Sequence, residues 1–135
     1  MFFSIFCNLI YDNLICLVIY RAEPEKIEYG MTFSVPYARE LGLNWKEVYR
    51  EMFRDLNVVR VRIPVYWSEV EPRRNQYEWS DIDFQLREAR AYDAEVILAI
   101  GRRVPRWPEC HIPEWAQGLS WEEEKEEARA YIRAV

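Results

Sequence analysis

The chain has 135 residues, of which 50% are hydrophobic, 30% charged and 16% aromatic, and its formal charge is −5. This hydrophobic share can fill a core, which excludes a disordered tail or a collagen-like fibre, and the acidic balance argues against a nucleic-acid partner. Three cysteines without a CxxC pair and one histidine argue against a disulfide framework and a zinc site, so we expect neither a metal nor a cofactor.

The first 20 residues form a hydrophobic segment in which sixteen residues are apolar. Its length matches the span of a bilayer core, although Asp12 near its centre opposes insertion. We expect a membrane anchor or an export signal, and hence a membrane-anchored or exported protein; the alternatives are a buried strand pair or a mis-assigned start, with a cytoplasmic location. Residues 21–26 then read as a polar linker.

The next elements are predicted from apolar patterning and capping residues. Residues 27–33 read as a first strand, and residues 34–42 as a loop rich in turn formers. Asn44 and Glu47 predict the capped start of a helix over residues 45–56. The apolar face predicted for this helix consists of Val48, Met52, Phe53 and Leu56.

Two further strands and two further helices follow in alternation. Residues 58–65 predict a strand that Pro64 brings to an end, and a loop then leads to residue 80. Ser80 is the predicted cap of a second helix, whose inner side should hold Ile82, Leu86 and Ala89. Residues 95–100 form a nearly continuous apolar run, typical of a parallel strand covered on both faces. After a long loop, Ser120 and Glu123 form a capping box for a third helix.

The resulting β-α-β-α-β-α order belongs to an α/β fold with a parallel sheet. An open doubly wound sheet and a (β/α)8 TIM barrel both fit this order. No glycine-rich phosphate loop follows any strand, whereas the loops after the second and third strands are long and rich in Trp, Arg and Pro. At about 31 residues per βα unit, residues 27–135 predict an incomplete TIM barrel of about the first three units.

Residues 61–107 carry a family resemblance through three features. Arg62-Ile63-Pro64 ends the second strand before an aromatic pair, and Glu71-Pro72 precedes Tyr77-Glu78-Trp79. The run VILAIG is followed by Pro105-Arg106-Trp107. Together these features resemble the N-terminal third of a clan-A (β/α)8-barrel glycoside hydrolase, of the family 5 cellulase-like and family 42 β-galactosidase-like type.

The chain departs from the resembling pattern at three places. Asn75 stands where the pattern has a glycine, and Tyr92-Asp93-Ala94 replaces a glycine turn. Asn tolerates a left-handed turn, whereas the second change removes a glycine that would end a helix and should cost stability. In the resembling enzymes the acid/base Glu follows an Asn on strand four and the nucleophile Glu ends strand seven, and the chain holds no Asn-Glu pair. No catalytic residue is therefore assigned.

The resemblance does imply substrate-binding residues. Arg62 should point into the barrel mouth and hydrogen-bond the nucleophile carboxylate, while Arg60 should be a packing or ion-pair residue. Glu71 occupies a position that is structural in the resembling enzymes, and His111 reads as a loop residue. The predicted substrate-binding set lies at or beyond strand ends and consists of Arg62, Tyr66, Trp67, Arg102, Arg103 and Trp107.

The resemblance implies hydrolysis of O-glycosyl bonds by a retaining mechanism with two carboxylates, and a carbohydrate substrate. The chain would then be the N-terminal part of such an enzyme. A membrane-tethered, non-catalytic sugar-binding or interaction remnant is the alternative, and a nonfunctional truncated product is a third reading. Because three strands of an unclosed barrel leave edges unpaired, we expect such a fragment to be aggregation-prone or to need a partner.

Overall fold

The computed structural model describes residues 6–8, 15–17, 29–104 and 109–135. The linker and the interior of the hydrophobic segment lie outside these residues. The secondary structure in chain order is β1 (Phe6–Asn8), β2 (Ile15–Leu17), β3 (Met31–Thr32), α1 (Val35–Glu40), α2 (Trp45–Arg54), β4 (Arg60–Val65), α3 (Trp67–Val70), α4 (Ser80–Ala91), β5 (Glu95–Ile100), a 3-10 turn (Glu114–Ala116) and α5 (Trp121–Ala134).

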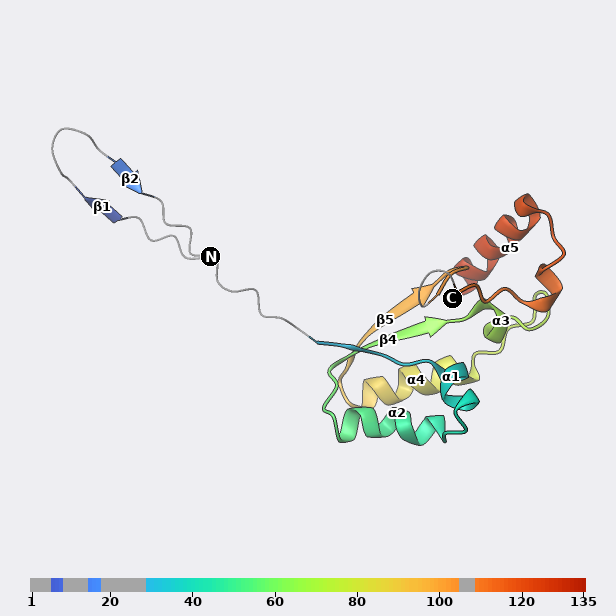
Figure 1. Cartoon of the computed structure of the whole chain (residues 1–135), viewed down its shortest axis with the longest axis horizontal. Helices are drawn as coiled ribbons and strands as arrows, with labels where there is room; N and C mark the ends of the chain where they lie inside the picture. Colours follow the sequence, from blue (N-terminus) through green and yellow to red (C-terminus); the bar gives the residue numbers. More distant parts are fainter. Residues whose placement is uncertain (1–5, 9–14, 18–28, 105–108) are drawn as a thin grey trace.

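A parallel sheet in the order β3-β4-β5 organises the body of the molecule (Figure 1). Arg62 on the central strand is flanked by Thr32 of β3 and by Ile97 of β5. This register confirms the predicted α/β class with parallel pairing. Two of the predicted strands begin later than expected, β3 at Met31 and β4 at Arg60.

Pro64 limits pairing on one side of β4 only. The backbone N–H of Phe33 donates to the carbonyl of Arg62 at 3.2 Å. The next bond of this parallel ladder would need a hydrogen on the nitrogen of residue 64, which proline lacks. Pairing with β3 therefore ends there, while β4 stays in register with β5 through Val65.

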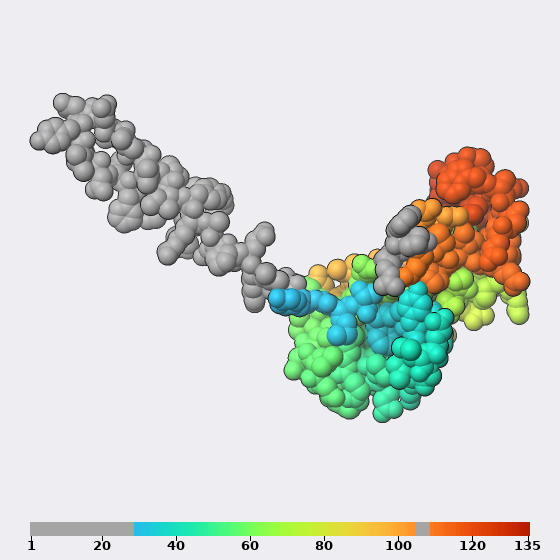
Figure 2. Space-filling view, in the orientation of Figure 1, coloured from blue at the N-terminus to red at the C-terminus, as the bar shows by residue number. Residues whose placement is uncertain are grey.

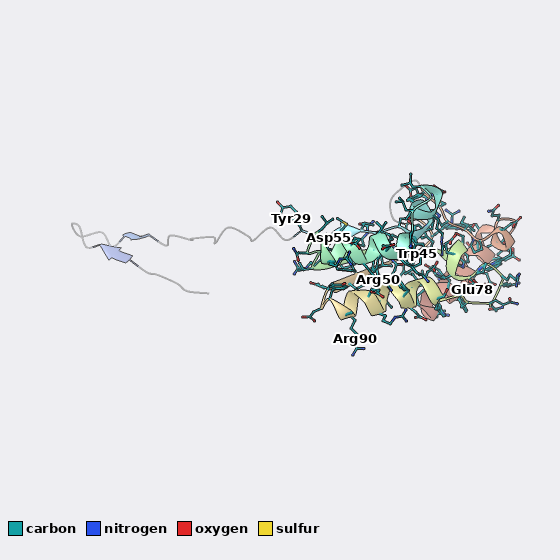
Figure 3. All side chains as sticks on the ribbon, turned by 90° about the horizontal axis from the view of Figure 1, so that it is seen from below. Tyr29, Trp45, Arg50, Asp55, Glu78 and Arg90 are labelled. Atoms are coloured by element: carbon teal, nitrogen blue, oxygen red, sulfur yellow. The ribbon has the colours of Figure 1, made fainter. Side chains whose placement is uncertain are left out.

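Helices α2 and α4 cover one face of the sheet, and Figure 3 shows them side by side. The hydroxyl of Tyr49 donates to the carbonyl of Gln85 at 3.2 Å, and Arg50 pairs with Glu88 through contacts of 3.0 and 3.1 Å. Tyr49 also makes edge contacts with the rings of Phe33 and Phe53, at centroid distances of 5.0 and 5.1 Å. These contacts place the centre of the core between the two helices and the sheet.

The inner faces of α2 and α4 differ from the predicted ones. In α2 the buried side chains are Trp45, Tyr49, Met52 and Phe53, whereas Val48 and Leu56 are exposed. Met52 and Phe53 are therefore buried as predicted, and the aromatic rings of Trp45 and Tyr49 take the places expected for Val48 and Leu56. In α4, Ile82 and Ala89 are buried as predicted, and Phe84 and Gln85 take the place expected for Leu86.

The capping predictions are confirmed at one helix only. Ser120 accepts from the backbone N–H of Glu123, whose carboxylate accepts from the backbone N–H of Ser120 at 2.9 Å, so α5 begins with a full capping box. Asn44 stands at the N-cap of α2 but bonds the Glu47 side chain instead of a backbone N–H. Ser80 is the first residue inside α4, where Trp79 is the N-cap, so the predicted Ser80 cap is wrong.

Two short helices occupy segments that were predicted as loops. The prediction of a loop over residues 34–42 missed α1, and the predicted loop after β4 contains α3. The departures from the family pattern take the expected backbone conformation, because Asn75 and Asp93 have φ of 60° and 54°. Asp93 is thus a non-glycine residue in a left-handed turn, as its place in the pattern suggested.

The sheet face opposite α2 and α4 is incompletely covered. The prediction that β5 is buried on both faces is wrong, since Ile97 is 53% exposed. Among the described residues, no helix is long and apolar enough to span a membrane. β1 and β2 pair with each other in antiparallel fashion, with Cys7 opposite Cys16.

Candidate functional site at the strand ends

The carboxyl ends of the three parallel strands lie at one edge of the sheet. β3 leads to Ser34, β4 leads to Tyr66, and β5 leads to Arg102 and the loop beyond it. In barrel enzymes this edge is where substrate binds. We call the surface formed by Ser34, Tyr37, Tyr66, Glu109 and His111 the strand-end face.

Arg62 lies on the sheet face away from the helices. Side chains alternate along a strand, and the buried residues Val61 and Ile63 face α2 and α4. Arg62 therefore points to the opposite side, where it is partly buried. Arg60 lies on the same side and pairs with Glu95 at 2.6 Å, which agrees with its predicted ion-pair role.

Tyr66 joins the ends of β3 and β4. It is almost fully buried, and its hydroxyl donates to Oγ of Ser34 at 2.8 Å. Its ring makes an edge contact with His111 at a centroid distance of 4.3 Å. His111 is held by backbone bonds on both sides, because its N–H donates to the Arg102 carbonyl and its carbonyl accepts from Ser68.

Glu109 brings a carboxylate to the same face. The hydroxyl of Tyr37, from α1, donates to Oε2 of Glu109 at 2.6 Å, and the same oxygen lies 3.9 Å from Nε2 of His111. Nε2 of His111 is buried and has no hydrogen-bond partner. Phenol, carboxylate and imidazole thus meet at the strand ends, where the partly exposed Tyr37 and Glu109 side chains can exchange hydrogen bonds with hydroxyl groups.

Trp67 lies in the core behind this face. It is fully buried, its ring stacks on Tyr131 and meets Trp115 edge-on, and its Nε1 donates to Oε2 of Glu71 at 2.8 Å. A ring with no exposed surface offers nothing to a sugar, so this geometry favours packing for Trp67.

Glu71 has a structural environment, as expected from its position in the family pattern. Besides the Trp67 indole, it accepts from the backbone N–H of Asn75 at 2.8 Å. Its backbone carbonyl accepts from Nε1 of Trp115 at 2.9 Å. Both carboxylate oxygens are therefore engaged in holding the loop between α3 and α4.

The arginines after β5 lie in different surroundings. Arg102 pairs with Glu124 of α5 and lies over the ring of Trp121, and the hydrogen bond to Glu124 raises the pKa of the Arg102 guanidinium. Arg103 is exposed. Trp107, the remaining predicted residue, lies outside the described residues.

Sequence reasoning missed part of the strand-end face. Ser34 could have been predicted as a site residue, because it directly follows a predicted strand. Tyr37 was hidden within a segment predicted as a loop, and Glu109 lies 72 residues further along the chain, so one sequence gives no indication of their contact. Within the described part of the chain, no three His, Cys, Asp or Glu side chains gather as metal ligands.

No family model matches the chain, and no curated protein matches it in sequence. Among solved structures, the chain is similar to the exo-β-1,4-mannosidase Op5Man5 from Opitutaceae bacterium strain TAV5, with a TM-score of 0.58 and 18% identity. The match covers 78% of this chain and 21% of the mannosidase, so the chain spans about a fifth of that protein's length. The described body therefore shares the fold of part of that structure, and its three-stranded parallel sheet is consistent with part of a TIM barrel.

Proposed function

We propose that the chain is the N-terminal part of a glycoside hydrolase that binds carbohydrate at the strand-end face. The observation that carries this proposal is the gathering of Tyr37, Glu109 and His111 at the carboxyl ends of the strands, with Arg62 on the central strand. The fold shared with part of the mannosidase supports it. A β-1,4-linked mannoside is the first substrate to consider, because the similar structure is a β-1,4-mannosidase.

The proposed reaction is hydrolysis of an O-glycosidic bond with retention of configuration. Retention needs two carboxylates about 5–5.5 Å apart, one acting as nucleophile and the other as acid and then base. By the family resemblance, these carboxylates belong to the fourth and seventh strands, which residues 1–135 do not include. Within the whole enzyme, Arg62 would lie beside the nucleophile, lower the pKa of its carboxyl group and keep it ionised.

The proposed sugar contacts retain most of the predicted set. Arg103 and Trp107 remain candidates at the strand ends, and Arg102 would contact a sugar beside its partner Glu124. Tyr66 is almost fully buried and would line the face from beneath. Trp67 supports the face from the core. A non-catalytic sugar-binding or interaction remnant, tethered to a membrane by residues 1–20, is the alternative.

Titration of the purified chain with β-1,4-mannotriose, followed by tryptophan fluorescence, tests carbohydrate binding. Arg62→Ala should weaken binding about tenfold or more, because it removes hydrogen bonds from a charged donor. Arg60→Ala is the matched control, since it removes an arginine from the same strand and the same side, and it should leave binding unchanged. A fluorescence signal that does not respond to mannotriose, or to a β-1,4-glucan oligosaccharide, would contradict the proposal.

The nucleotide sequence that follows codon 135 tests the catalytic part. A continuing frame should encode a strand ending in Asn-Glu and, later, a second strand-end Glu. A stop codon directly after Val135, combined with sugar binding by the chain, would favour the non-catalytic alternative.

A further inference from the structure

Trp121 is the one exposed tryptophan in the described part of the chain. Its exposed fraction is 61%, whereas the other four described tryptophans are buried or partly buried. The indole N–H groups of Trp67 and Trp115 both donate to Glu71, but that of Trp121 donates to no described residue. Tryptophan is highly buried on average and is enriched where proteins bind partners. A tryptophan ring left in solvent therefore marks a candidate binding surface.

The position of this ring is fixed by the start of α5. Trp121 is the first residue of the helix, directly after Ser120 of the capping box. Arg102 lies over the ring, with its guanidinium carbon 5.7 Å from the ring centroid, and the same guanidinium pairs with Glu124 in the first turn of the helix. A cation in this place is attracted by the negative face of the indole. The ring is thus held in place without being buried.

Arg102 connects Trp121 to the strand-end face. It follows the carboxyl end of β5, and its Nη1 donates to Sγ of Cys110 at 3.7 Å. Cys110 stands between Glu109 and His111 in the chain, and the Arg102 carbonyl accepts from the backbone N–H of His111. In Figure 2 the residues after β5, in orange, lie against those of α5, in red. Trp121 therefore borders the strand-end face on the side of α5.

An indole beside a guanidinium offers both kinds of contact that a sugar ring makes. The C–H groups on one side of a pyranose ring form an apolar surface that packs on an aromatic face, and its hydroxyl groups accept hydrogen bonds from a guanidinium. Arg102 lies over the ring of Trp121, and the ring still keeps most of its surface open to solvent. Removal of this apolar surface from water would favour the contact with a sugar.

We propose that Trp121 is the stacking platform for a second sugar unit, next to the unit held at the strand-end face. This inference rests on the proposed function and adds to it, because it makes the ligand an oligosaccharide rather than a single sugar. Trp121 is then a substrate-binding residue outside the predicted set. Arg102 lies between the positions of the two sugar units.

The dependence of affinity on sugar length tests this role in the full chain. Isothermal titration calorimetry compares the binding of mannose with that of β-1,4-mannotriose. In the unaltered chain, mannotriose should bind about tenfold more tightly, because it covers the indole as well as the strand-end face. Trp121→Ala should remove most of this gain and leave the affinity for mannose unchanged, whereas Arg62→Ala should weaken the binding of both sugars.

Tyr29→Ala is the matched control for the loss of an exposed ring. Tyr29 is 79% exposed and lies outside the strand-end face, so its removal should leave both affinities unchanged. Trp121→Phe keeps an aromatic ring at the start of α5 and should retain part of the gain that Trp121→Ala loses. Circular dichroism checks that each variant is folded.

A second measurement follows the ring itself. The difference in acrylamide quenching between the unaltered chain and Trp121→Phe isolates the emission of Trp121. Without sugar this emission should be readily quenched, because the ring is exposed. Saturating mannotriose should remove about half or more of this quenching, since a stacked sugar covers the open face of the ring.

The outcomes separate this inference from the proposed function. Failure of the unaltered chain to bind mannotriose or a β-1,4-glucan oligosaccharide would overturn both. Binding that Arg62→Ala weakens and Trp121→Ala leaves intact would overturn the stacking platform and keep the proposed function. Equal weakening of mannose and mannotriose binding by Trp121→Ala would overturn the platform as well, and so would an indole that is shielded from acrylamide before sugar is added.

Discussion

At the scale of single residues, buried polar groups fix the loops around the strand ends. Glu71 accepts hydrogen bonds from the Trp67 indole and the Asn75 backbone, so one carboxylate holds both a core ring and a turn. The family pattern predicted a structural Glu71, but only its burial and its partners show which groups it holds. The same limit applies to Tyr37 and Glu109, whose contact joins segments far apart in the chain.

Replacing Glu71 should be costly. Glu71→Ala leaves the buried Trp67 indole N–H and the Asn75 backbone N–H without their acceptor and should lower the free energy of unfolding by about 2–4 kcal/mol. Glu69→Ala removes a neighbouring, half-exposed carboxylate whose contact with Arg39 is 3.5 Å, and should cost less than about 1 kcal/mol. Urea denaturation measures both. Equal losses in the two variants would contradict the role given to Glu71.

Two buried tyrosines should make stability fall at alkaline pH. Burial raises the pKa of Tyr49 and of Tyr131 well above the ordinary value of 10.0. Above pH 10 the unfolded chain releases these protons while the folded chain keeps them, so the unfolded state becomes relatively more stable. Each tyrosine should contribute a slope approaching about 1.4 kcal/mol per pH unit.

Urea denaturation at pH 9, 10 and 11 measures this slope. Tyr131→Phe should roughly halve it, because the variant retains only one of these two buried tyrosines. It should also lose about 1 kcal/mol at neutral pH, since the hydroxyl of Tyr131 donates to the carbonyl of Val65. An unaltered slope in Tyr131→Phe would count against burial of this hydroxyl as the cause.

At the scale of elements, the sequence predicts strands better than short helices and helix faces. β5 has the predicted bounds, because its apolar run is long and flanked by polar residues. α1 and α3, with six and four residues, are too short to show a helical repeat. In α2, the spacing of Trp45, Tyr49, Met52 and Phe53 fits a helix face, but large aromatic rings displaced the smaller aliphatic residues from the core.

The two predicted serine caps form a matched pair for experiment. Ser120→Ala removes the acceptor that begins α5 and should cost about 1 kcal/mol. Ser80→Ala removes a serine that caps no helix and should change stability by less than about 0.5 kcal/mol. Thermal or urea unfolding distinguishes them. A larger loss in Ser80→Ala than in Ser120→Ala would overturn this assignment of the caps.

At the scale of the whole molecule, the sheet buries one face against helices and leaves part of the other uncovered. Alternating β and α patterns were sufficient to predict the parallel sheet. Whether a sheet face is buried depends on which other segments of the chain pack against it. The apolar run of β5 therefore could not predict that Ile97 is 53% exposed.

This exposed face should make the chain self-associate. Ile97→Glu should reduce association measured by sedimentation velocity, because it places a charge within the uncovered sheet face. Val48→Glu adds the same charge on the outer side of α2 and should leave association unchanged. Equal effects of the two substitutions would show that net charge, rather than this face, controls association.

Because of Pro64, the two strand pairs of the sheet are held together by different kinds of hydrogen bond. β4 and β5 pair through their backbones from Arg60 to Val65. Beyond Phe33, β3 and β4 are joined by the side-chain hydrogen bond between Tyr66 and Ser34. A backbone ladder is fixed whatever the side chains are, but a side-chain bond changes with a single codon. The spacing between the carboxyl ends of β3 and β4 can therefore change during evolution without the loss of any backbone hydrogen bond of the sheet.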